Sequence, residues 1–324
     1  MSSTHAHRTQ ALLMLLVANL FWGLSFPVIK AVALVHEQVL PGSGNWFITA
    51  MTVAPRFVLA LLILAVLQGR GLGDFSGKEV RQGVALGLFA AVGMIFQNDG
   101  LQFTEASTSA FLTQFYAIMI PVYVALRGRR NPGSRVWIAC ALVLAGVAIL
   151  GRFDWSTLRF GRGEWETLLS SVFFMGQILW LERSEFAGNR PGKITVVMFA
   201  TQAAMFTALA LATAPSIAAI AIPFTSPAWV LLTLVLTFFC TIGAYTIMNT
   251  FQPRITATEA GLIYCIEPVF GSLLALFLPG LFSVWAGIQY GNETATWTLL
   301  LGGSFITAAN LLIQFRPPTK VAAT

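Results

Sequence analysis

Long apolar runs constrain this chain more than any other feature of its sequence. Ten runs, most of them about 20 residues long, occupy 11–35, 47–67, 80–101, 104–126, 134–151, 164–182, 194–214, 228–249, 256–279 and 296–315. A segment in hydrocarbon must satisfy its own backbone hydrogen bonds, so such a run is a helix unless it joins a closed β-barrel. The alternating strands of a barrel do not occur in the pattern. The sequence therefore predicts an all-α integral membrane protein with ten transmembrane helices.

Composition agrees with this prediction. Apolar residues make up 56% of the chain, charged residues only 10%, and the mean hydropathy is +0.76, whereas about a quarter of the residues in soluble domains are charged. The connections between the runs are too short for a soluble domain. The first run is longer than the apolar region of a cleaved signal peptide, so we expect it to stay as an anchor. One domain in the lipid bilayer is predicted.

The basic residues predict the orientation of the chain. With the N-terminus in the cytoplasm, the inside segments carry 14 of the 19 lysine and arginine residues. The outside connections carry three, Arg152, Arg159 and Arg162, and the other two, Lys30 and Arg56, lie within predicted spans. This distribution explains the net charge of +6 without nucleic acid as a partner. A multi-pass protein of the inner cell membrane with both termini in the cytoplasm is expected.

The polar segment 152–163 divides the chain into two halves of five predicted spans, 1–151 and 164–324. The segments TEASTSAFLTQFYAIMIP (104–121) and TATEAGLIYCIEP (256–268) begin with small and hydroxyl residues and end at a proline. Because five is odd, the second half inserts upside down relative to the first. This predicts two inverted five-helix repeats around a central cavity, as in many secondary transporters. A chance likeness between two apolar helices is the alternative.

These segments, together with LLVANLFWGLSFPVIKA (15–31) and AYTIMNTFQPRITATEAGLIYCIEPVFGSLLAL (244–276), resemble the drug/metabolite transporter superfamily, EamA type. The resemblance covers nearly the whole chain and rests on the order and spacing of the motifs. It implies ten helices, cytoplasmic termini, and export or exchange of small metabolites, often amino acids, through a central cavity. The connection GLFSVWAGIQYGNETATW (280–297) departs from the brief turn that relatives usually have here.

Two charged residues lie near the middle of predicted spans. An arginine at this depth costs at least about 2.5 kcal/mol, so Arg56 should face a cavity or a partner. Its donors suit a substrate carboxylate, and a structural clamp on carbonyl groups or a neighbouring acid is an equal alternative. Glu267 is the one carboxylate in the middle of a predicted span. It is a candidate proton carrier, or it serves helix packing as part of the Glu-Pro pattern of the resembled family.

Further candidates are polar or aromatic residues inside the predicted spans. For the substrate cavity they are Trp22, Gln97, Thr113, Gln114, Tyr116, Gln177, Trp180, Tyr245 and Tyr264, some of which must instead bond one helix to another. Pro27, Pro121 and Pro268 are candidate hinges because proline removes a backbone hydrogen bond, with ordinary packing as the alternative. Lys30 either extends to the outer headgroups or lines the outer part of the cavity.

The sequence thus predicts a secondary transporter that exports or exchanges small polar metabolites, amino acids above all, by alternating access, with protons as candidate coupling ions. A passive facilitator and a drug exporter are alternatives, and a membrane scaffold or a membrane-embedded enzyme is a more distant one. The three histidines lie in the tail or the first outside loop, and neither a P-loop nor a G-x-S-x-G elbow occurs. We therefore expect no catalytic residue, metal or cofactor.

Overall fold

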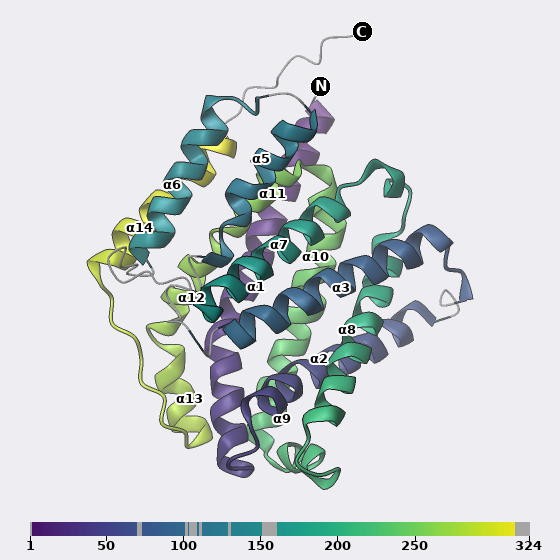
Figure 1. Ribbon diagram of the computed structural model, residues 1–324, viewed down its shortest axis with the longest axis vertical. Coiled ribbons are helices and arrows are strands. Elements are labelled where there is room, and N and C mark those ends of the chain that lie inside the picture. The colour runs from purple at the N-terminus through teal and green to yellow at the C-terminus, as the bar shows by residue number, and fades with distance from the viewer. Residues whose placement is uncertain are drawn as a thin grey trace.

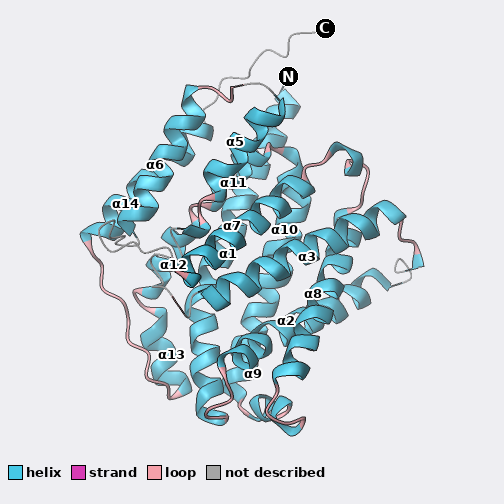
Figure 2. Ribbon diagram, in the orientation of Figure 1, coloured by secondary structure: helices cyan, strands magenta, loops and turns pink. Residues whose placement is uncertain are grey.

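The fold is helical throughout the residues that the computed structural model describes, which are 2–69, 73–100, 103, 109, 112–128, 131–150 and 161–314. Figure 2 shows helices joined by loops, and no strand occurs among these residues. The helices are α1 (Ser2–Val39), α2 (Asn45–Gln68), α3 (Gly77–Gly100), α5 (Tyr116–Gly128), α6 (Ser134–Leu150), α7 (Arg162–Leu181), α8 (Pro191–Thr213), α9 (Pro227–Val235), α10 (Ala244–Phe251), α11 (Ala257–Tyr264), α12 (Glu267–Ala275), α13 (Leu278–Ala286) and α14 (Trp297–Gln314). The predicted all-α class is confirmed.

Five helical segments are long and apolar enough to cross a membrane, judged by length and composition. They are His7–Val39, Asn45–Gln68, Gly77–Gly100, Pro191–Thr213 and Pro227–Arg254, and the bent run from α11 to α13 brings the number to as many as six. Helices α5, α6 and α14 are apolar but shorter. Each of the ten predicted runs overlaps a helix. The chain is a multi-pass membrane protein, while ten crossings and the inverted repeat stay predictions.

The structure differs from the predicted layout near the C-terminal end of the span 256–279. The predicted span 256–279 is broken into three helices and continues to Ala286, so the connection before α14 is 287–296 rather than 280–297. The reason is that the apolar pattern continues through Leu281 and Trp285, which keep the chain helical as α13. Most of the predicted outside connection, 152–160, and most of the segment 104–111 fall outside the described residues.

Helix α3 packs closely against both α7 and α8, and α2 lies beside α8 (Figure 1). Glycines make the close approach possible. A Cβ added at Gly87 would lie 2.6 Å from Thr201 Cβ and 2.9 Å from the Met198 carbonyl oxygen, and one at Gly83 would lie 2.6 Å from Val197 Cβ. Small residues at four-residue spacing let helix backbones approach in this way. The wall formed by α2, α3 and α8 is therefore tightly packed.

Two breaks interrupt helices in the segments that the sequence pairs between the halves. A turn at 114–115 precedes α5, and a turn at 265–266 separates α11 from α12. Pro268 lies in the first turn of α12, where proline costs no helical hydrogen bond. A further bend of 53° separates the α11–α12 run from α13. Pro27 and Pro121, in contrast, lie inside continuous helices.

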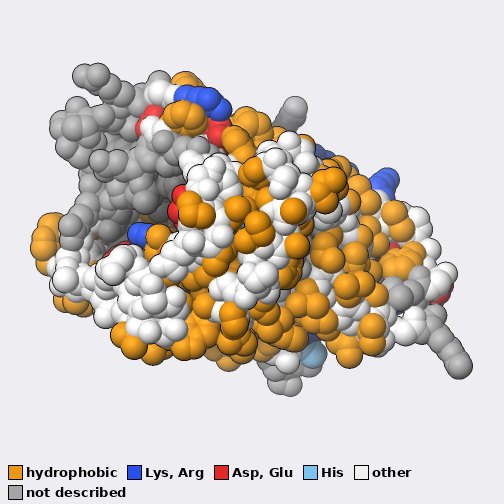
Figure 3. Space-filling view, turned by 90° about the horizontal axis from the view of Figure 1, so that it is seen from below, with side chains coloured by type: hydrophobic (Ala, Val, Ile, Leu, Met, Phe, Trp, Pro, Cys, Tyr) orange, Lys and Arg blue, Asp and Glu red, His pale blue; other side chains and the backbone are white. Residues whose placement is uncertain are grey.

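Charged groups gather at the end of the molecule where α1 begins, which we call the terminal end. The described end of α14 lies there too (Figure 1). The Arg190 guanidinium holds Glu79 through two hydrogen bonds of 2.7 and 2.9 Å, and it holds Asp74 at 2.8 Å, which lowers the pKa of Asp74. Arg8 of α1 pairs with Glu259 of α11 at 2.7 Å. The opposite end shows mainly apolar and uncharged side chains on its described part (Figure 3).

Replacing Gly87 by alanine should destabilise the protein by about 1 to 3 kcal/mol, because the new methyl group forces α3 away from the α8 backbone. Gly128→Ala is the matched control, since nothing lies within 4 Å of a Cβ added there. Thermal unfolding of the purified chain in detergent measures both changes. Equal midpoints for the two variants would contradict the close contact between α3 and α8.

Candidate functional site

Arg56 is the side chain around which the candidate site is built. It lies inside α2 and is only 5% exposed. Its Nη2 lies 4.0 Å from Met94 Sδ, and its Cζ lies 5.2 Å from the centroid of the neighbouring Phe57 ring. A thioether sulfur is a weak acceptor, and Nε has no hydrogen-bond partner. Among the described residues, then, no acid or carbonyl group neutralises this buried cation.

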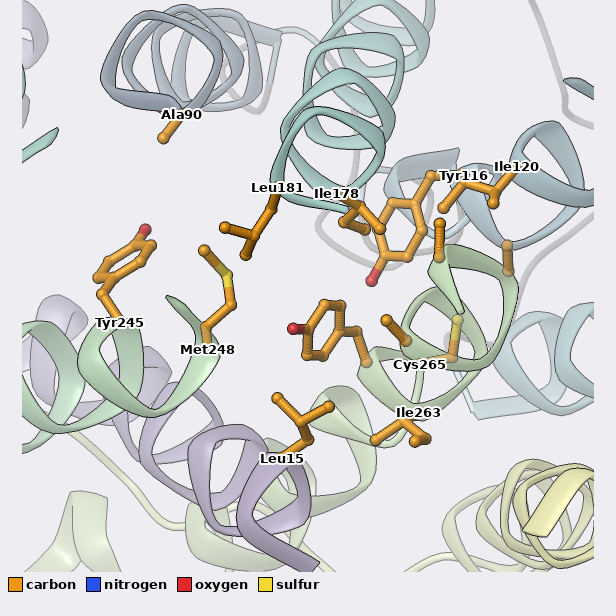
Figure 4. Close-up of a cluster of buried hydrophobic side chains, with 14 of the residues drawn as sticks. Leu15, Ala90, Tyr116, Ile120, Ile178, Leu181, Tyr245, Met248, Ile263 and Cys265 are labelled. Atoms are coloured by element: carbon orange, nitrogen blue, oxygen red, sulfur yellow. The ribbon is translucent and has the colours of Figure 1, made fainter. Parts of the chain in front are cut away.

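Aromatic rings from four other helices surround this region. The Trp22 ring meets Tyr245 and Tyr264 edge-on, with centroids 5.5 and 5.4 Å apart. Tyr245 also lies 6.0 Å from Phe57 and 6.1 Å from Phe199. Figure 4 shows the Tyr245 hydroxyl pointing away from Met248, toward the side of α3 that carries Ala90. The structure thus brings three sequence-predicted residues, Trp22, Tyr245 and Tyr264, into one cluster.

A π-helical segment, Leu236–Gly243, joins α9 to α10 beside Arg56. Cys240 in this segment is buried and lies within electrostatic reach of Arg56. Thr241 is fully buried, and its hydroxyl has no partner among the described residues. Irregular π segments are rare and often occur at functional sites. Sequence reasoning missed this one, because its apolar run looks like any other span.

Buried amides without partners lie on the surrounding helices. Gln202 of α8 is fully buried, and neither amide atom has a hydrogen-bond partner among the described residues. Gln68 Nε2 donates to the Gly192 carbonyl at 2.8 Å, and Phe57 packs on Phe199 at 5.5 Å. These two contacts make α2 and α8 antiparallel and place Gln202 near the level of Arg56. Leaving such a group unpaired costs about 1 to 3 kcal/mol, which a bound substrate or water would recover.

The predicted Gln114, Gln177 and Trp180 also keep a buried atom, Oε1, Nε2 and Nε1 respectively, that has no partner in the described part of the chain. Trp180 packs against Phe186, 5.4 Å away between centroids, and therefore lies toward the connection between α7 and α8. The Tyr116 side chain is buried next to Ile178 (Figure 4). These residues line the interior but do not all converge on Arg56.

Other predicted residues make bonds between helices, which was the alternative expected for some of them. The Tyr264 hydroxyl donates to Gln252 Oε1 at 2.7 Å, and Gln252 Nε2 donates to the Ile178 carbonyl at 2.8 Å. Gln97 Nε2 donates to Thr113 Oγ1 at 3.2 Å. Tyr264 thus presents its ring to the aromatic cluster, while its hydroxyl ties α11 to the segment after α10.

Glu267 begins α12 at the helix break and is partly exposed. It forms no hydrogen bond or ion pair with any described residue. Tyr245 and Cys240 lie within electrostatic reach of both Glu267 and Arg56, so the two side chains flank the same region of the bundle, and no ion pair joins them. Lys30 is exposed on α1, two turns beyond Trp22 on the same helix face, with Nζ 5.1 Å from the centroid of the Tyr290 ring. Along α1, Lys30 therefore lies farther than Trp22 from the terminal end.

Gln202→Leu should raise or preserve stability, since an apolar side chain of similar size removes two unpaired polar atoms. Gln252→Leu, the matched variant, should lose about 1 to 3 kcal/mol because it breaks two buried hydrogen bonds. Thermal unfolding in detergent compares the two. A loss at Gln202 as large as that at Gln252 would mean that the Gln202 amide has a protein partner.

Comparison with known proteins gives consistent matches. The model of the EamA-like transporter family matches residues 9–152. An uncharacterized transporter from Archaeoglobus fulgidus is 26% identical over 270 residues, which cover 83% of this chain and 78% of that relative. A crystal structure of another protein covers 94% of this chain and 96% of its own, with a TM-score of 0.69 at 16% identity, and so supports the fold alone. Residues 9–152, which include Arg56, thus match the EamA-like transporter family.

Proposed function

We propose that this protein is a secondary transporter that exports or exchanges small polar metabolites, amino acids above all, by alternating access across the inner cell membrane. Arg56 carries this proposal, because it is a buried cation that no acid or carbonyl group pairs with among the described residues, and its Nε has no hydrogen-bond partner there. Ionisable groups inside membrane segments mark substrate or ion pathways. The family match supports transport, and the substrate class rests on the chemistry of the site.

Arg56 suits the carboxylate that amino acids share. A guanidinium can bind a carboxylate through two parallel hydrogen bonds, which fixes its orientation as well as its position. The rings of Trp22 and Tyr245 offer apolar faces to a side chain and π-faces to an ammonium group. The free amide of Gln202 can bond to a further polar group. This combination favours a small zwitterion over a purely apolar compound.

The contacts at the terminal end support a state that is closed there. Arg8 holds Glu259 at 2.7 Å, and Glu182 Oε2 accepts the Ala257 backbone N–H at 2.6 Å. Gln252 adds its bonds to Tyr264 and Ile178. Together they tie the start of α11 to α1 and α7. If the basic residues mark the cytoplasmic side, these contacts form a gate that faces the cytoplasm. They must break for the substrate to enter from there.

The helix breaks at 114–115 and 265–266 support the inverted repeat. They interrupt the two segments that correspond between the proposed halves, and paired interrupted helices mark the substrate site in inverted-repeat transporters. Glu267 follows the second break directly. Its position facing the same interior as Arg56 makes it the candidate group for proton coupling.

Counterflow uptake of labelled amino acids into proteoliposomes tests the proposed function. Arg56→Ala should lower the uptake rate by at least about tenfold, because one charge-assisted hydrogen bond contributes about 1.5 to 3 kcal/mol. Arg127→Ala removes an exposed arginine that bonds only to Tyr123 among the described residues and should leave uptake unchanged. Full uptake by Arg56→Ala would remove the arginine from the mechanism.

Proton coupling has its own test. An imposed pH gradient should accelerate uptake by the wild-type protein, and Glu267→Gln, which cannot exchange a proton, should abolish the acceleration while keeping exchange at equal pH. A wild-type protein that is indifferent to the gradient would instead be a passive facilitator. Acceleration that survives in Glu267→Gln would assign the proton to another group.

A further inference from the structure

An apolar groove lies on the outside of the bundle, between α13 on one wall and α9 with its π-helical segment on the other. Nine side chains line a volume of about 490 Å³, and every one of them is aliphatic or aromatic. One wall includes Leu231, Val235 and Phe238, and the other includes Leu281 and Trp285. Phe238 is 50% and Leu281 is 58% exposed. Both walls belong to segments with the length and composition of membrane spans.

The size and chemistry of the groove identify its occupant. A standard protein interface engages about 20 to 30 residues on each side, and the nine side chains of the groove alone are too few to form one with a second copy of the chain. The volume falls within the range of about 300 to 1,000 Å³ that holds small ligands. A polar metabolite would need hydrogen-bonding groups, and the lining side chains supply none apart from the Trp285 indole. We propose that this groove binds an acyl chain of a membrane phospholipid.

The bound acyl chain would support the π-helical segment from outside the bundle. Phe238 and Phe239 face the groove, and Phe239 also packs edge-on against Phe21 of α1 at 5.6 Å. Cys240 and Thr241 of the same segment are buried, and Cys240 lies within electrostatic reach of Arg56 of α2. An acyl chain in the groove fills the space beside Phe238 and holds this segment against α1 and α2, next to Arg56. The groove is thus a lipid site that borders the proposed substrate site through one shared helix.

Quenching of tryptophan fluorescence tests this proposal on the full chain in detergent. The probe is a phosphatidylglycerol with dibrominated acyl chains, whose bromine atoms quench only nearby rings. We expect quenching that saturates near one lipid per chain, with the saturable part lost in Trp285→Phe. Val235→Phe narrows the groove and should raise the half-saturating lipid concentration roughly tenfold. Val66→Phe makes the same change at a 79% exposed position of α2 and should behave as wild type.

Two results would overturn the proposal. Quenching that does not saturate and is equal in wild type, Val235→Phe and Trp285→Phe would reduce the groove to ordinary lipid-facing surface. A dimer that Val235→Phe converts to monomers, with lipid quenching unchanged, would make a second copy the occupant. Leu281→Phe narrows the opposite wall and replaces Val235→Phe if that variant does not fold. Because the experiment measures lipid binding, its result does not depend on whether the protein transports the proposed substrate.

Discussion

A positive charge held in an apolar bundle, with no counter-ion among the described residues, is the constraint on which the rest of the structure depends. Burying an ion is unfavourable unless it is paired, and the described surroundings of Arg56 offer only the Met94 sulfur and the Phe57 ring at close range. An anion that enters this region therefore finds a cation that no acid among the described residues neutralises. In the proposed function, Arg56 is the cation that binds the substrate carboxylate.

The two sides of this site differ in how they are built. On one side, glycines bring α3 into backbone contact with α8, so α2, α3 and α8 form a closely packed wall. On the other side, the chain is irregular, with a π-helical segment before α10 and breaks around α12. Irregular helices keep fewer regular backbone hydrogen bonds and resist rearrangement less. In the proposed transport cycle, movement concentrates on the irregular side while the packed wall holds Arg56 in place.

The sequence predicted the features that depend on composition and local pattern. Apolar runs located the helices, and the rarity of charge within them identified Arg56 and Glu267. The resemblance to a known family and the aromatic residues inside spans pointed to Trp22 and Tyr245. The π-helical segment could not be found, because its apolar residues follow no distinctive period. Nor could the bond from Tyr264 to Gln252 or the isolation of Gln202, since both depend on which helices become neighbours.

The most direct test of the central claim is an experimental structure of the full chain in lipid nanodiscs with a transported amino acid bound. The account predicts the substrate carboxylate at about 2.7 to 3.2 Å from the Arg56 guanidinium, with Trp22 and Tyr245 against the rest of the molecule. A substrate bound elsewhere, while Arg56 pairs with Glu267 or with backbone carbonyl groups, would contradict it and make the arginine a structural clamp.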